Sequence, residues 1–139
     1  MNTFSKASIS LEAARVVMEA AQVQAIQEGL AIAITIVDES GVMKSFVRMN
    51  GAPLVAVEVS RRKALTAVGF GMSTGKDWYD FIKDDPILSN GADSIPDFTL
   101  LGGGLPIWLD EQLVGAIGVS GGHYSVDERC AQAGLAALS

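Results

Sequence analysis

Two β-rich runs in the first third of the chain constrain its fold more than any other feature. The runs AIAITIVD (31–38) and VMKSFVRM (42–49) are separated only by the tripeptide ESG. Gly41 ends that tripeptide and supplies the positive φ that a tight turn often needs. Two such runs around so short a connection predict an antiparallel β-hairpin, with Arg48 and Asn50 where its second strand ends.

Helical patterns flank this hairpin on both sides. Residues 11–28 place apolar side chains on one stripe, with Ser10 as the expected N-cap and Gly29 as the stop. After the hairpin, Pro53 can occupy the first turn of a second helix, because its missing N–H costs nothing there. The pattern of this second helix continues to about Gly69.

The second half of the chain is expected to contain a short helix, three strands and a final helix. Residues 77–111 include eight acidic residues and one lysine, which indicates a solvated acidic segment. Its first part, KDWYDFIK, predicts a short helix capped by Thr74, and Pro86 interrupts the helical pattern beyond it. The runs DFTLL, LPIWL and LVGAIGVS are strand candidates. A last helix begins at Ser125, which can form a capping box with Glu128.

The predicted order is therefore helix, two strands, one or two helices, three strands and helix. This order favours an α+β fold with a single antiparallel five-stranded sheet flanked by helices, rather than alternating parallel units. A chain of 139 residues has the size of one ordinary domain, and it contains no tandem repeat or low-complexity linker. We expect residues 1–139 to form a single domain.

Composition excludes several classes of protein and favours self-assembly. The net charge of −6 opposes binding to nucleic acid. No apolar run is long enough to cross a membrane and no export signal is visible, so the cytoplasm is the expected location. The sole cysteine, Cys130, is expected to be a buried reduced thiol. Because 49% of the residues are apolar and the mean hydropathy is +0.32, we expect a homo-oligomer that buries the surplus between subunits.

Two glycine-rich stretches resemble nucleotide loops only superficially. GFGMSTGKD has Phe70 where a Walker loop needs glycine, and Asp77 follows Lys76 where serine or threonine would bind magnesium. GAIGVSGG lacks the Gly-x-Gly-x-x-Gly spacing and an early strand–turn–helix unit. Gly115 and Gly118 fall on opposite faces of the predicted strand, so each more plausibly marks close approach by a helix, another subunit or a ligand.

Four segments resemble a known family over nearly the whole chain. VDESGVMKSFVRMNGAPL, RKALTAVGFGMST, GGGLPI and LVGAIGVSGGHYSVDERCAQAGLAAL together are similar to the GlcG/HbpS family, the haem-degrading domain family related to the C-terminal domain of PduO. The resemblance implies a profilin-like or PAS-like sheet and assembly from dimers up to octamers. Members occur beside glycolate oxidation, diol utilisation and aromatic breakdown genes, and some bind haem. It therefore implies a small-molecule or tetrapyrrole site, with haem as a candidate cofactor.

This chain departs from the family at the positions that would bring histidines to haem. Relatives commonly carry histidine after the hairpin glycine, whereas this chain has Val42 there and no histidine in its N-terminal helix. His123 is the only imidazole, so it would be the metal ligand only where haem is bound. Softer axial ligands could come from Met18, Met43, Met49 and Met72.

Glycine-rich turns supply the first group of candidate ligand-binding residues. Gly121 and Gly122 follow the last strand and precede a helix N-terminus, so their N–H groups could approach an anionic ligand, or they could simply turn the chain. His123 comes next, with a pKa range that suits proton transfer. The LGGGLP turn, with Gly103, Gly104 and Pro106, could line a ligand or only connect two strands.

Charged residues supply the second group. Lys63 interrupts an apolar helical stripe, so its amine either extends to solvent or reaches an acidic partner or an anionic ligand. Arg48, beside Asn50, offers a fork for a carboxylate or an ion pair with the acidic segment. Asp38 and Glu58 could accept protons or pair with these cations, and Glu58 lies one turn before Arg62, which suits an ion pair.

Two functions from different classes are compatible with these residues. The first is an oligomeric small-molecule-binding or accessory protein of a catabolic pathway, whose pocket holds a small acid, an aromatic compound or a tetrapyrrole such as haem. The second is a cofactor-independent enzyme of isomerase, lyase or hydrolase type, acting on a small anionic or aromatic metabolite. In the second, Arg48 or Lys63 would hold the anion, and His123 or a carboxylate would move the proton, with Lys63 as a further catalytic candidate.

Overall fold

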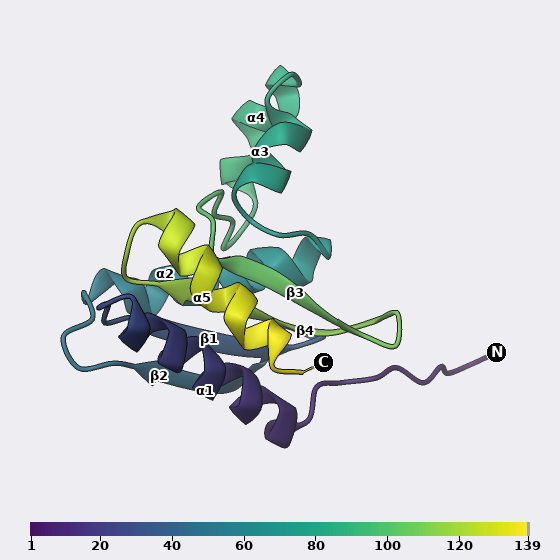
Figure 1. The fold of residues 1–139 in the computed structure, drawn as a ribbon. Coiled ribbons are helices and arrows are strands. Elements are labelled where there is room, and N and C mark those ends of the chain that lie inside the picture. Colours follow the sequence, from purple (N-terminus) through teal and green to yellow (C-terminus); the bar gives the residue numbers. More distant parts are fainter. Residues whose placement is uncertain (139) are drawn as a thin grey trace.

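The computed structural model describes residues 1–138, which form an α+β domain (Figure 1). The helices and strands, in chain order, are α1 (Leu11–Gln27), β1 (Ala33–Asp38), β2 (Met43–Arg48), α2 (Val55–Phe70), α3 (Lys76–Ile82), α4 (Pro86–Gly91), the 3₁₀ helix η1 (Ala92–Ser94), β3 (Gly104–Leu109), β4 (Gln112–Ser120) and α5 (Tyr124–Ala136). The predicted hairpin is present as β1 and β2, which are antiparallel. Ser10 caps α1 as predicted, since its hydroxyl accepts the Ala13 N–H at 3.0 Å.

The sheet has four strands in the order β2-β1-β4-β3, with every neighbouring pair antiparallel. The prediction of a fifth strand was wrong, because DFTLL is irregular. Its backbone groups bond to residues outside the sheet: the Thr99 N–H donates to the hydroxyl of Thr66 on α2, and the Leu100 carbonyl accepts the Gly75 N–H at 2.7 Å. Because these backbone groups are already hydrogen-bonded, they are not available to pair with a neighbouring strand.

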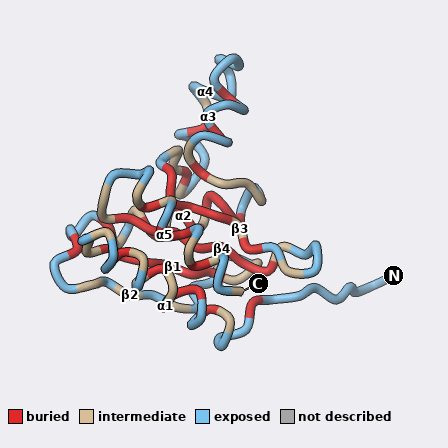
Figure 2. Tube along the Cα trace, viewed as in Figure 1, coloured by how far each residue is buried: buried red, intermediate tan, exposed pale blue. Residues whose placement is uncertain are grey.

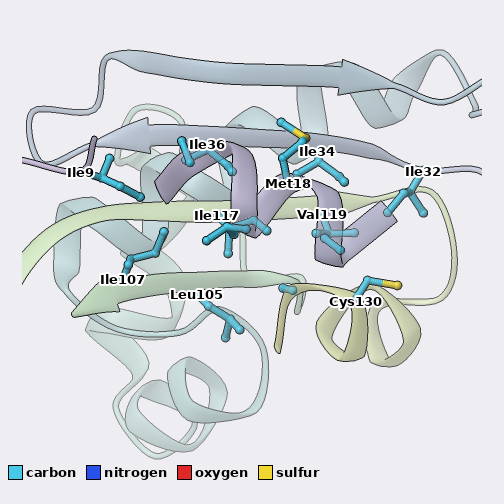
Figure 3. Packing of buried hydrophobic residues seen from close by; sticks show 14 of the residues in the cluster. Ile9, Met18, Ile32, Ile34, Ile36, Leu105, Ile107, Ile117, Val119 and Cys130 are labelled. Atoms are coloured by element: carbon cyan, nitrogen blue, oxygen red, sulfur yellow. The ribbon is translucent and has the colours of Figure 1, made fainter. Parts of the chain in front are cut away.

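The two faces of the sheet are covered by different helices (Figure 1). Helices α1 and α5 pack against each other and on one face, where alternating residues of β1 and β4 form the main core (Figure 3). Helix α2 packs on the other face over β1, β4 and β3. A smaller cluster including Val37, Ala64 and Ala116 fills that second interface.

Small residues in β4 allow α2 to lie unusually close to the sheet. A Cβ at Gly118 would collide with the Ser60 carbonyl oxygen and would lie 2.6 Å from the Ala64 nitrogen, both of which are backbone atoms. Gly118 therefore marks close approach by a helix, one of the alternatives left open by the sequence. Beside it, the hydroxyls of Thr35 and Ser60 form a buried 2.8 Å hydrogen bond between β1 and α2.

Residues 76–97, which we call the acidic arm, project from the body of the domain (Figure 1). The arm leaves and rejoins the body beside β3, where the Thr74 N–H donates to the Gly104 carbonyl. Thr74 does not cap α3 as predicted, because its hydroxyl accepts the Gly104 N–H at 2.9 Å and Gly75 takes the N-cap position. A small aromatic cluster holds the base of the arm, with Trp78 and Phe98 buried. Most of the rest of the arm is exposed (Figure 2).

Candidate functional site

A cleft of about 510 Å³ lies between α3, the loop before β3 and the first turn of α5. Its lining residues come from three separate parts of the chain: Gly75, Lys76, Tyr79, Leu100, Leu101, Gly102, Tyr124 and Glu128. Two glycines of the lining pack closely together, because a Cβ on Gly75 would lie 2.9 Å from the Gly102 Cα. The volume is within the usual range for small-molecule sites.

His123 is the N-cap of α5, next to the cleft residue Tyr124. Its Nδ1 accepts the Ser125 N–H at 3.2 Å and lies 2.7 Å from the Ser125 hydroxyl. The predicted capping box that starts at Ser125 is therefore wrong, since the imidazole of His123 caps the helix instead. Because Nδ1 accepts a backbone N–H, the neutral ring carries its proton on Nε2. The ring also packs on Tyr124, with centroids 4.1 Å apart.

Lys63 and Asp127 form an ion pair inside the domain. The Lys63 ammonium donates to Asp127 Oδ2 at 3.0 Å and to the Val119 carbonyl at 2.7 Å. Each residue is only 1% exposed. Burial lowers the Lys63 pKa, and the attraction of Asp127 and Glu128 opposes that shift. Of the alternatives for Lys63, the acidic partner is therefore the one present.

The same Asp127 also fixes the glycine turn before α5. Its Oδ1 accepts the Gly122 N–H at 2.9 Å, so one carboxylate joins this turn to Lys63 on α2. Gly121 has a φ of 147°, and a Cβ there would lie 2.7 Å from the Ala31 carbonyl oxygen. The turn is thus held by its packing on the residues that precede β1.

The LGGGLP segment lies against the buried ion pair. A Cβ on Gly103 would lie 2.5 Å from the Val119 oxygen and 3.0 Å from the Lys63 ammonium nitrogen. At Gly104 it would collide with the Lys63 carbonyl. Pro106 is half-buried in β3 opposite Ala116. These positions are shaped by packing between β3 and α2, and in this segment only the preceding Leu101 and Gly102 line the cleft.

Arg48 and Asn50 lie away from the cleft, on or just beyond the edge strand β2. The guanidinium of Arg48 donates from Nε and Nη2 to the Ala52 carbonyl, at 3.1 and 2.7 Å, and thereby closes the turn before α2. No salt bridge joins Arg48 to the acidic arm within residues 1–138. The structure therefore does not bring Arg48 and Asn50 together with Lys63 and His123.

The remaining polar candidates, Asp38 and Glu58, already form local hydrogen bonds and ion pairs. Asp38 accepts the N–H groups of Ser40 and Val42 and closes the hairpin turn. Glu58 pairs with Arg62 as predicted, at 3.1 Å, and more closely with Arg61 at 2.7 Å. Hydrogen bonds from Arg61 and Arg62 lower the Glu58 pKa to about 2, which makes it a weak proton acceptor.

The sulfur-containing residues also lie outside the cleft lining. Cys130 is a buried free thiol, as predicted, and burial raises its pKa to about 11. Met18 belongs to the main core, Met49 packs against that core and Met72 packs against the aromatic cluster of the arm, while Met43 is exposed. Among the described residues, no three His, Cys, Asp or Glu side chains gather as a metal-binding group.

Sequence reasoning missed the residues that line the cleft. Tyr79 belongs to the segment 77–111, which was interpreted as solvated and acidic, and Lys76 directly precedes that segment. Leu100 and Leu101 belong to a predicted strand. Tyr124 lies directly after His123 but was not a candidate. The one available signal was the group of aromatic residues in KDWYDFIK, since three large rings are unusual in a fully solvated helix.

These features define a small antiparallel α+β domain with an open, aromatic-walled cleft. Residues 9–136 match the family model described as Haem degrading protein HbpS-like, and the chain belongs to this family. No helix within residues 1–138 is long and apolar enough to span a bilayer.

Three similar proteins illustrate the extent of the match. Protein GlcG of Escherichia coli K12 is 29% identical over 119 residues, covering 84% of this chain and 84% of GlcG. The crystal structure of a Streptomyces reticuli HbpS double mutant has a TM-score of 0.88 at 30% identity and covers 99% of this chain and 91% of that one. The PduOC:haem complex has a TM-score of 0.85 at 29% identity, with 94% of each chain covered.

Proposed function

We propose that this chain is a small-molecule-binding accessory protein of a catabolic pathway, and that its ligand is a planar aromatic molecule held in the cleft. The observation that carries this proposal is the pair of tyrosines, Tyr79 from α3 and Tyr124 from α5, that line a single cleft of about 510 Å³. Both side chains are about half exposed. Aromatic rings on two walls favour flat, apolar ligands, because stacking adds to the burial of apolar area.

Polar groups at the cleft indicate what the edge of the ligand carries. Lys76 is strongly exposed and uses its ammonium on Asp80, and the same ammonium has further donors for a carboxylate. Glu128, on α5, can accept from a hydroxyl or amine. An aromatic ligand with an acid group for Lys76 and a hydrogen-bond donor for Glu128 would match both residues.

Haem needs a flat apolar site and, where its iron is bound, an axial ligand. The tyrosines and leucines suit the porphyrin plane, but the lining contains no histidine or methionine. His123, the only histidine of the sequence, precedes the lining residue Tyr124. It carries its proton on Nε2, while its Nδ1 caps α5. Ligation through Nε2 would move that proton to Nδ1 and remove the acceptor of the Ser125 N–H. The lining therefore suits a porphyrin ring and supplies no histidine or methionine for its iron, so an axial ligand from the lining would have to be a tyrosine phenolate, from Tyr79 or Tyr124.

Self-assembly in the cytoplasm is also part of the proposal. The mean hydropathy of +0.32 and the many exposed large apolar side chains support burial between subunits. The alternative, a cofactor-independent enzyme, has weaker support from the geometry. Lys63 is closed off from solvent and Glu58 has a pKa of about 2, so neither is placed to move a proton to a ligand in the cleft.

The test compares haem with metal-free protoporphyrin IX in absorbance titrations. We expect both to bind with similar affinity, because recognition uses the ring plane. Tyr124→Ala and Tyr79→Ala should each weaken binding at least tenfold, about 1.4 kcal/mol, while the exposed Phe4→Ala serves as the matched control. Binding of haem alone, abolished by His123→Asn, would instead indicate iron ligation and overturn the proposal.

A further inference from the structure

Glu128 brings a carboxylate without a partner to the wall of the cleft. Its side chain is partly buried in the cleft lining, four residues after Tyr124 and on the same face of α5. Within residues 1–138, the structure assigns no hydrogen bond or salt bridge to this carboxylate. Each neighbouring cation pairs with a different acid: Lys63 with Asp127, Arg129 with Glu28 and Lys76 with Asp80. The Glu128 carboxylate is therefore free to accept hydrogen bonds from a ligand.

Gly102 leaves open the space beside that carboxylate. A Cβ there would lie 3.5 Å from Glu128 Oε2 and 3.5 Å from the ring of Tyr124. Both are ordinary van der Waals distances, so packing would permit a side chain at this position. Gly75, in contrast, has a φ of 84°, and a Cβ there would lie 2.9 Å from the Gly102 Cα. The space at Gly102 is thus a part of the cleft where a ligand can contact both the Tyr124 ring and the Glu128 carboxylate.

Lys76 is placed less well than Glu128 to select a ligand. Its side chain is 82% exposed, and its ammonium donates to Asp80 at 2.5 Å. That hydrogen bond raises the Lys76 pKa, and the charge of Asp77 acts in the same direction. The ammonium is therefore charged but already paired. An acid group on a ligand would share an exposed ion pair that water screens, so it adds little discrimination.

A ligand that reaches Glu128 displaces water from its carboxylate. A donor group on the ligand restores the lost hydrogen bonds, whereas a ring without a donor leaves the acceptor unsatisfied. Sites that hydrogen-bond a hydroxyl or amine of the ligand discriminate against analogues that lack it. Because Glu128 is only partly buried, water still reaches part of it, and we expect a preference of about tenfold.

We propose that Glu128 is the specificity-determining residue of the cleft, and that it selects aromatic ligands whose ring carries a hydroxyl or amino group. The inference rests on the proposed function, because it needs the aromatic site between Tyr79 and Tyr124. It goes further by ranking the two polar side chains. The donor group at Glu128 decides which aromatic molecule binds, and an acid group at Lys76 does not.

Naphthoates that share one acid group and one ring system provide the experiment. The probes are 2-naphthoate, 6-hydroxy-2-naphthoate and 6-methoxy-2-naphthoate, each titrated by calorimetry into the parent chain. The hydroxy probe should bind about tenfold more tightly than 2-naphthoate. The methoxy probe should gain none of this preference, because its ether oxygen has no proton to donate.

Substitutions at Glu128 test whether the preference comes from this carboxylate. Glu128→Met removes the acceptor and keeps an unbranched side chain, so it should bring the ratio of the dissociation constants of 2-naphthoate and its hydroxy derivative close to one. Glu128→Gln keeps a neutral acceptor and should give an intermediate ratio. Loss of the negative charge strengthens the binding of both anionic probes alike, so the ratio does not respond to it.

Two further variants serve as comparisons. Glu19→Met, exposed on α1 and outside the cleft lining, makes the same substitution and should keep the parent ratio. Lys76→Met acts on the acid group that the probes share, so it should change both dissociation constants by one common factor. Urea unfolding of each variant checks that the folded chain is measured.

The outcomes separate this inference from the proposed function. If the parent binds the three probes equally, or if Glu128→Met keeps the hydroxyl preference, the inference is overturned, and weaker binding by Tyr124→Ala still supports the proposed function. If Tyr124→Ala binds every probe as tightly as the parent, the aromatic site itself is wrong and both are overturned. A parent that binds none of the probes also overturns both.

Discussion

Removing one partner of the Lys63–Asp127 ion pair should destabilise the domain strongly. Asp127→Asn keeps the shape of the side chain and an acceptor for the Gly122 N–H, but it leaves the Lys63 ammonium with the Val119 carbonyl only. Because both residues are 1% exposed, solvent cannot replace the lost carboxylate. We expect a loss of about 3–5 kcal/mol of unfolding free energy. Lys63→Met should cost a similar amount, since it leaves a buried carboxylate unpaired.

A double variant measures how strongly Lys63 and Asp127 are coupled. With both charges gone, Lys63→Met combined with Asp127→Asn should lose less stability than either single variant. Urea unfolding followed by circular dichroism, at one fixed protein concentration, measures all four chains. If the two single losses simply add, the residues are not coupled and the reasoning from their geometry is refuted.

The same pair gives the stability a defined pH dependence. Burial lowers the Lys63 pKa in the folded chain below its usual value of 10.5. Between the folded pKa and 10.5 the unfolded chain therefore binds more protons at this residue, and its contribution to stability rises with pH. Relative to Lys63→Met, the parent should gain stability on going upward through this alkaline window. A parent that loses stability relative to the variant there would contradict the lowered pKa.

Three further predictions concern single residues. His123→Asn should retain the α5 cap, because asparagine is a good N-cap, whereas His123→Ala should cost about 1 kcal/mol in urea unfolding; equal stabilities would exclude the cap role. Gly118→Ala should cost about 3 kcal/mol in the same assay, since its Cβ meets the backbone of Ser60 and Ala64, and an unchanged stability would mean that α2 can move away. Cys130 should react with a thiol reagent only on unfolding, and rapid labelling of the folded chain would contradict its burial and its raised pKa of about 11.

Local sequence signals predicted the parts of the fold that local interactions decide. The β1–β2 hairpin has its turn glycine next to β-rich runs, and α1 has a serine cap whose acceptor role needs only neighbouring backbone. The fifth strand failed for the opposite reason. Thr99 and Leu100 bond to Thr66 and Gly75, distant partners that no window of sequence around DFTLL reveals. Thr74 likewise serves Gly104, thirty residues away, instead of α3.

Sequence reasoning identified only those site residues whose type is unusual for the sequence around them. Lys63 stood out because a charge interrupts an apolar stripe, but its partner Asp127 lies 64 residues later and was not singled out. His123 stood out as the only imidazole, and its role as a helix cap was missed because histidine is not among the usual caps. Tyr124 carried no such signal, since a half-exposed tyrosine on a helix is ordinary until the fold brings it to a cleft, and the aromatic residues around Tyr79 were the only hint of the opposite wall.

The buried ion pair also determines where one wall of the cleft lies. Asp127 is three residues after Tyr124 on α5, and it ties that helix to α2 through Lys63 and to the glycine turn through Gly122. Gly103 packs against the same ammonium group, next to Gly102 in the cleft lining. A loss of ligand affinity in Lys63→Met would therefore not by itself identify Lys63 as a ligand-binding residue. A positioning role predicts that affinity and stability fall together, whereas direct contact, as proposed for Tyr124, predicts a loss of affinity at unchanged stability.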